Sequence, residues 1–233
     1  NWYVNDSVYS WNTVSSSVLP SGWHHIATVA NSSVSQIFVD GILNASGSGI
    51  TTSIPSNTSS VIHLGHDGRY PDDTSDYRNG DFKISELRVW SLARTQAEIQ
   101  TYSVSCLTPT VSGLVLYNQF GDGAGSNSVT SMIGPNGILQ HMDSIADWVE
   151  GSGKECCTGA VAAALKFDGV NDRINLGNSI STLFNPLNVI TVEAWVNPTS
   201  VAGNGAIVGN YNSPSQMQFL LRRDGTRYAI LVK

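Results

Sequence analysis

Oxygen-bearing side chains that could hold a metal ion gather in two loops of the sequence. One tight loop carries Asp168, Asn171 and Asp172. The other is more acidic, with carboxylates at Asp67, Asp72, Asp73, Asp76 and Asp81. Carboxylate and amide oxygens on loops suit Ca²⁺, so both loops are predicted to be structural calcium sites. The alternatives are an Asp-Gly turn closed by its own hydrogen bonds, and a solvated loop paired with Arg69 and Arg78.

Aromatic residues beside amides predict a ligand surface. Tyr70 and Tyr77 flank the acidic loop, and Tyr211 follows Asn210. Sugars stack their apolar faces on aromatic rings and need a few well-placed polar groups. Tyr70, Tyr77, Tyr211 and Asn210 are therefore predicted to bind ligand. The tryptophans Trp23, Trp90 and Trp195 are expected to fill the core instead.

The residues that could catalyse a reaction are sparse. Glycosidases need two carboxylates across the scissile bond, but no Glu here has an acidic residue two or four positions away: Glu86, Glu98, Glu150, Glu155 and Glu193. No nucleophile elbow or His-Glu-x-x-His motif occurs. The adjacent His24 and His25 point to opposite faces of a strand. The sequence therefore predicts a protein that is not an enzyme.

The three cysteines are Cys106, Cys156 and Cys157. A disulfide is expected from Cys106 to either Cys156 or Cys157, because adjacent cysteines rarely bond to each other. The alternative is three reduced thiols.

Composition narrows the class of protein. Only 13% of the 233 residues are charged, the net charge is −6, and 41% are apolar. This composition is typical of a secreted, extracellular β protein and not of a disordered chain. The chain has no basic stripe for nucleic acid and no apolar run long enough for membrane insertion. Asn1 is not a plausible translation start, so we expect a piece of a longer secreted protein.

Alternating apolar residues predict strands along most of the chain. The runs 23–30, 82–90 and 190–196 show this period, with one slip near Ser85 that indicates a bulge. Asp40-Gly41 and Asp224-Gly225 are typical hairpin turns. Thr95 and Glu98 fit a capping box, with Ile99 and Tyr102 facing the sheet. We therefore predict an all-β, antiparallel β-sandwich with one short helix.

Several of these runs resemble a known family. Trp23-His24-His25-Ile26-Ala27, Ile37-Phe38-Val39-Asp40-Gly41 and Phe82-x-Ile84-x-Glu86-Leu87-Arg88-Val89-Trp90 resemble the second half of a laminin-G-like, concanavalin A-type (pentraxin-type) jelly-roll. Leu165-x-Phe167-Asp168-Gly169 and Thr191-Val192-Glu193-Ala194-Trp195-Val196 resemble its first half. The halves are thus permuted: 1–105 is the C-terminal half, 106–160 a lead-in or linker segment with small β elements, and 161–233 the N-terminal half. A tandem array cut within a domain, or a circular permutation, would produce this order.

The resemblance implies function and further sites. It implies a non-enzymatic repeat of a large bacterial cell-surface adhesin or filament, exported by a type IX route and binding glycans or cell-surface polysaccharide. Its neighbours would be copies of the same repeat. A passive structural spacer is the alternative, and a jelly-roll glycoside hydrolase the third interpretation.

The family often holds calcium near the loop of Asp168, close to the strand of Glu86, although Ser85 stands where many relatives have Asp. Asp6-Ser7-Val8 and Asp143-Ser144-Ile145 resemble a motif that some gliding bacteria O-glycosylate, at Ser7 and Ser144.

Overall fold

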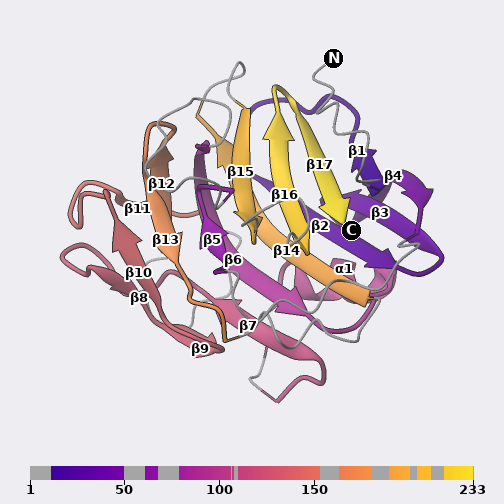
Figure 1. Cartoon of the computed structure of the whole chain (residues 1–233), viewed down its shortest axis with the longest axis horizontal. Coiled ribbons are helices and arrows are strands. Elements are labelled where there is room, and N and C mark those ends of the chain that lie inside the picture. Colours follow the sequence, from indigo (N-terminus) through magenta and orange to yellow (C-terminus); the bar gives the residue numbers. More distant parts are fainter. Residues whose placement is uncertain are drawn as a thin grey trace.

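Two antiparallel sheets face each other (Figure 1). The structure, a computed structural model, describes residues 12–49, 61–67, 79–105, 107, 110–152, 163–179, 189–199, 204–210 and 218–232. Within these residues the front sheet has eight strands, in the spatial order β1 (Asn12–Ser15), β17 (Arg227–Val232), β16 (Phe219–Asp224), β15 (Asn204–Gly209), β5 (His63–Leu64), β13 (Arg173–Asn175), β10 (Gly137–Gln140) and β8 (Ser128–Val129).

The back sheet has nine strands in the same part of the chain. Seven lie in the order β11 (Trp148–Glu150), β12 (Ala163–Asp168), β6 (Asp81–Trp90), β14 (Val189–Pro198), β2 (His24–Asn31), β3 (Val34–Val39) and β4 (Ile42–Ser48). The other two extend it beside β6: β7 (Leu114–Asn118) pairs with β6, and β9 (Ser131–Ile133) pairs with β7. The predicted all-β, antiparallel sandwich is confirmed.

Strands from the two ends of the sequence interleave in both sheets. In the back sheet β14 lies between β6 and β2, and β12 pairs with β6. In the front sheet β1 pairs with β17, with Asn12 opposite Val232. The described strands of 106–160, β7 to β11, also join these two sheets. Residues of all three sequence segments therefore contribute to one sandwich.

Strand β6 contains a bulge where its neighbour changes. Residues 81–84 pair with β12, whereas residues 87–90 pair with β7. Between them Glu86 has φ 54°, a left-handed conformation that is unusual for a non-glycine residue. The register with β14 shifts between Glu193 and Trp195. The irregularity predicted near Ser85 is confirmed.

The core between the sheets is aliphatic and phenylalanine-rich. Phe82 and Phe167 stack with ring centroids 4.8 Å apart, and Ile84, Val192 and Ile230 are buried among them. Trp90 and Trp195 are buried, but the prediction that they fill this core is wrong. They alternate with the core residues of β6 and β14, so they project from the outer face of the back sheet.

The helix covers that outer face. Helix α1 (Gln96–Tyr102) begins with the predicted capping box, in which Thr95 and Glu98 bond each other's backbone N–H groups. Ile99 is 1% exposed and packs on Ala27, Val29 and Phe38 of the back sheet. Figure 1 shows α1 behind the back sheet, on the side away from the front sheet.

No helix among the described residues is long and apolar enough to cross a membrane.

Candidate functional site

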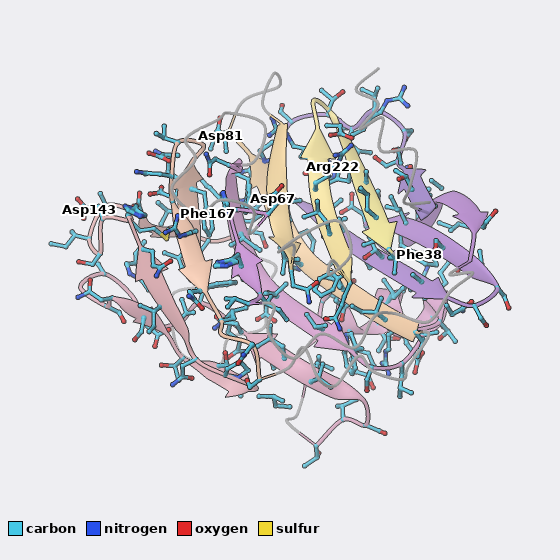
Figure 2. All side chains as sticks on the ribbon, viewed as in Figure 1. Phe38, Asp67, Asp81, Asp143, Phe167 and Arg222 are labelled. Atoms are coloured by element: carbon cyan, nitrogen blue, oxygen red, sulfur yellow. The ribbon has the colours of Figure 1, made fainter. Side chains whose placement is uncertain are left out.

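The two predicted acidic groups meet at one side of the sandwich. Asp168, the last residue of β12, lies directly opposite Asp81, the first residue of β6. Asp67 is buried and follows His66, whose backbone bridges to Asn79 just before Asp81. Figure 2 shows Asp67, Asp81 and Phe167 toward this same side. The remaining carboxylates of the acidic loop, Asp72, Asp73 and Asp76, lie outside the described residues.

The loop after Phe167 is ordered by its own hydrogen bonds. Asp168 Oδ1 accepts from the backbone N–H groups of Val170, at 2.7 Å, and Asn171, at 3.4 Å. Asp172 Oδ2 accepts from the Asp168 N–H at 2.9 Å. Burial, with the charges of Asp168 and Asp147, raises the pKa of Asp172 to about 7. Among the described residues no three His, Cys, Asp or Glu side chains form a group that could hold a metal ion.

Glu86 does not join this loop, which corrects its assignment as a calcium ligand beside Asp168. It lies five positions along β6 from Asp81, the partner of Asp168, which corresponds to roughly 16 Å of strand. Its Oε2 instead accepts a hydrogen bond from Arg88 at 2.8 Å, and its side chain is 1% exposed. The bulge turns this carboxylate to the outer face, away from the loop.

Calcium at Asp168, Asn171 and Asp172 stays a prediction with a direct test. If the ion binds, chelation should lower the melting temperature, because a ligand of the native state stabilises it by about 2.7 kcal/mol at a hundredfold excess over Kd. Asp168→Ala should remove the response. Asp143→Ala is the matched control, because Asp143 Oδ1 also closes a turn, accepting from Ile145 and Ala146. A melting temperature that ignores chelator would assign the loop to turn formation alone.

Of the predicted ligand-binding residues only Asn210 is described. It is fully buried, its Nδ2 donates to Gln218 Oε1, and its Oδ1 accepts from the N–H groups of Gln218 and Phe219. Asn210 thus joins the ends of β15 and β16 and offers no polar atom to a ligand, so its assignment is corrected. Tyr70, Tyr77 and Tyr211 lie outside the described residues.

The predicted covalent sites remain untested. Cys106, Cys156, Cys157 and Ser7 lie outside the described residues. Ser144 is half-buried in the turn before β11, and its carbonyl accepts from the Gly125 N–H at 2.6 Å.

A buried charged cluster occupies the outer face of the back sheet. Arg88 Nη2 bonds Glu86 at 2.8 Å, and Arg88 Nη1 lies 3.8 Å from Glu193 Oε1. Trp90 Nε1 donates to the same Glu193 oxygen at 2.9 Å, and Tyr117 is hydrogen-bonded to Glu86. All these side chains are at most 2% exposed. Burial raises the pKa of Glu193, although Arg88 opposes the shift.

The same cluster fastens the helix to the sheet. Arg88 Nη1 donates to the Tyr102 carbonyl at 2.5 Å, and Trp195 Nε1 donates to the Ser103 carbonyl at 3.0 Å. The last carbonyls of a helix have no partner within it, so these side chains supply one. Arg94 stacks on Trp90, 4.1 Å from the ring centroid, and pairs with Glu98. The carboxylates of Glu86 and Glu193 on this outer face are therefore shielded from solvent.

His25 gives this cluster a predicted pH dependence. Burial, and then the charge of Arg88, lower its pKa to about 3, against 6.5 normally. Between about pH 3 and 6.5, His25 is therefore protonated in the unfolded chain but neutral in the folded chain. The contribution of neutral His25 to the free energy of unfolding is fully present above pH 6.5. It decreases as pH falls toward 3, by about 2 kcal/mol between pH 7 and 5.

His25→Phe should abolish that part of the acid sensitivity and leave the neutral-pH stability near wild type, since neither ring nitrogen of His25 is hydrogen-bonded within the described structure. Denaturant titrations at pH 7, 6 and 5 would measure it, with the exposed His141→Asn as control. An unchanged pH slope in His25→Phe would contradict the assignment.

A second feature is a pocket between the ends of the two sheets, which we call the mouth pocket. Three segments line it: Leu19, Pro20 and Ser21 after β1; Pro198 and Thr199 at the end of β14; and Arg223, Gly225, Thr226 and Tyr228 of the β16–β17 hairpin. It holds about 380 Å³ of space, part of it open to solvent. Because this volume includes open solvent, the enclosed part of the pocket is much smaller than an ordinary ligand site.

Backbone and side-chain bonds hold the three walls together. The Leu19 N–H donates to the Thr226 carbonyl at 2.9 Å, and the Ser16 hydroxyl accepts from the Tyr228 N–H. The Asp81 carbonyl accepts from Arg223 Nη1 at 3.2 Å and from the Thr199 N–H at 3.4 Å. Hydrogen bonds therefore fix the three lining segments of the pocket relative to one another.

Arg223 and Tyr228 form the pocket floor. They lie directly opposite each other on β16 and β17, and are 3% and 1% exposed. Burial lowers the pKa of Arg223, against the opposing effects of Tyr228 and Asp81, and burial raises the pKa of Tyr228. Within the described structure the Tyr228 hydroxyl has no hydrogen-bond partner.

The sequence predictions missed both the cluster and the mouth pocket. The pocket comes from loops that are distant in sequence, and no local pattern marks it. For the cluster a signal existed, because Glu193 stands alone among apolar residues in the middle of a long strand. An isolated charge in that position suggests a buried, paired carboxylate.

Comparison with known proteins agrees with the architecture. Residues 1–100 match the family model Laminin_G_3, described as the concanavalin A-like lectin/glucanases superfamily. No curated protein matches the chain. The structure is also the two-sheet, antiparallel sandwich that the resemblance implied. Residues 1–100 are therefore similar to the laminin-G-like domains of the concanavalin A-like lectin/glucanases superfamily, and the β-sandwich is consistent with that fold.

Proposed function

We propose that this chain is a non-enzymatic, glycan-binding module of a large secreted adhesin or filament at the cell surface. Its partners would be cell-surface polysaccharides and neighbouring repeats of the same polypeptide. The superfamily includes both lectins and glucanases. Binding without hydrolysis is favoured by one observation: the carboxylates on the outer face of the back sheet are buried and paired.

A glucanase needs two carboxyl groups that reach a glycosidic bond from either side. Glu86 and Glu193 flank Arg88 on neighbouring strands, but both side chains are 1% exposed. Glu86 is bonded to Arg88, Glu193 to Trp90, and helix α1 lies over this face. Glu98 is used in the helix cap. This arrangement stabilises the domain and gives a polysaccharide no access to the pair.

The mouth pocket supports binding, because it remains open while the outer face is closed. It combines apolar walls with a few polar groups, as sugar-binding sites do. A passive spacer would need no such pocket.

A glycan array with the intact chain, with and without calcium, tests the proposal. We expect binding to a restricted set of glycans. In parallel, β-glucans and the bound glycans are incubated with the chain and assayed for new reducing ends. Binding without hydrolysis supports the module; released reducing ends would make it a glycosidase. Binding to no glycan would favour the spacer.

A further inference from the structure

The end of helix α1 covers a buried histidine on the outer face of the back sheet. His25 is 2% exposed and lies on β2, in line with the two β2 residues on which Ile99 of the helix packs. The His25 ring lies 5.5 Å from that of Trp195, whose Nε1 donates to the Ser103 carbonyl just after the helix. The helix end therefore covers His25 through the Trp195 ring.

This cover is held by few apolar contacts. Helix α1 has seven residues, and Ile99 is the one that is buried. A helix of this length is not stable by itself in water. Its other attachments are polar, since Arg88 donates to the Tyr102 carbonyl and Arg94 stacks on Trp90. Segments held in this way open at a lower cost in free energy than the whole domain, so α1 is expected to open before the sandwich unfolds.

Charged groups from several elements face His25. Glu193 Oε2 on β14 lies 3.6 Å from His25 Nε2, but neither ring nitrogen of His25 is hydrogen-bonded within the described structure. Arg88 on β6 disfavours a proton on His25, and Asp40 after β3 favours one.

The other charges nearby are already paired. Glu193 accepts from Trp90 and lies near Arg88, and on the helix side Glu98 pairs with Arg94. Burial is nevertheless the largest obstacle to protonating His25, and only opening of the cover removes it.

We propose that helix α1 and the turn after it, residues 96–105, form an acid-labile cover that opens as a unit while the sandwich stays folded, and that protonation of His25 holds this cover open. The inference does not depend on glycan binding. Opening would expose the aromatic and charged side chains that α1 covers on the outer face of the back sheet (Figure 1). In mild acid the domain would thus present a second surface.

The pH range of the opening follows from the two environments of His25. With the cover open, the ring is in water and has its ordinary pKa of 6.5, whereas burial under the closed cover lowers the pKa to about 3. The preference for the closed form is therefore complete above pH 6.5 and decreases as pH falls toward 3. Between pH 7 and 5 the equilibrium constant for opening should rise about 25-fold.

Hydrogen exchange of the intact chain at pH 7, 6 and 5, corrected for the intrinsic exchange rates, tests the proposal. The N–H groups of Ile99 and Ser103 report on the cover, because they bond the carbonyls of Thr95 and Ile99. The amides of β14 report on unfolding of the sandwich. We expect the cover amides to exchange faster than those of β14, through an opening that low urea concentrations barely change and that increases about 25-fold from pH 7 to 5.

Three variants identify the group responsible. His25→Phe should keep the local opening and lose its increase in acid, whereas the exposed His141→Asn should keep both. Trp195→Phe removes the bond to the Ser103 carbonyl and should increase opening at every pH without changing its pH dependence. Cover amides that exchange only together with β14 would overturn the cover. A local opening that does not increase in acid, or that increases equally in His25→Phe, would overturn the role of His25.

Discussion

Arg88→Met is expected to lower the free energy of unfolding by about 3–5 kcal/mol, because it leaves two buried carboxylates without their cation. Arg88 bonds Glu86 at 2.8 Å, lies 3.8 Å from Glu193, and is 2% exposed. Burial opposes its charge, but Glu193 and Glu86 together raise its pKa above the ordinary value. Urea denaturation at pH 7 would measure the loss.

The pH dependence of the variant separates charge from packing. Without Arg88, the pKa of Glu193 should rise further, because burial already raises it and the largest opposing effect is the charge of Arg88. An acid whose pKa is raised by folding loses stability as pH rises, so the deficit of Arg88→Met should be smaller at pH 5 than at pH 8. A deficit that is the same at both pH values would indicate lost packing rather than unpaired charge.

Two further variants serve as controls. Adding Glu86→Gln and Glu193→Gln to Arg88→Met removes the charges while keeping acceptors for Tyr117 and Trp90, and should recover a large part of the stability. Arg222→Met breaks a partly exposed pair with Asp224, on the front sheet (Figure 2), and should cost about 1 kcal/mol or less.

Much of the fold could be predicted because its signals are local. The alternation in β14, the capping box at Thr95 and the bulge near Ser85 depend on residues close together in the sequence. The positions of Trp90 and Trp195 could not be derived this way. A strand whose two faces are both buried has no polar side, so periodicity alone does not say which face meets the other sheet.

Less of the candidate site could be predicted, because it depends on strand register. Glu86 and Asp168 lie on adjacent strands, yet the register pairs Asp168 with Asp81 and leaves Glu86 far along β6. The mouth pocket joins residues 19–21, 198–199 and 223–228, which no sequence pattern connects. Registers and loop contacts of this kind arise from packing between distant segments.

Gly65→Ala is expected to destabilise the protein by about 2–4 kcal/mol, for two separate reasons. Gly65 has φ +78°, where a side chain strains the backbone. A Cβ atom there would also lie 2.3 Å from Phe167 Cδ1 and 2.7 Å from the Asp172 carbonyl oxygen. Thermal and denaturant unfolding would measure the combined effect.

Gly177→Ala separates these two causes. Gly177 has φ +70°, nearly the same backbone conformation, but a Cβ atom there would meet nothing within 4 Å. Its replacement should therefore cost only the backbone strain, about 1–2 kcal/mol. The extra loss in Gly65→Ala is then the clash. Combining Gly65→Ala with Phe167→Leu should recover part of that loss, because the two sites are in contact and their effects are not additive.

The clash should be large because Gly65 lies where several strands converge. Its N–H donates to the Ile207 carbonyl of β15 at 3.0 Å, and its carbonyl accepts from the Gly80 N–H at 2.8 Å. Leu64, the preceding residue, pairs with both Ile174 and Val208. A shift of Gly65 would thus disturb β13, β15 and the start of β6 together. Equal destabilisation by Gly65→Ala and Gly177→Ala would show that Phe167 can move aside and that this close approach is not required.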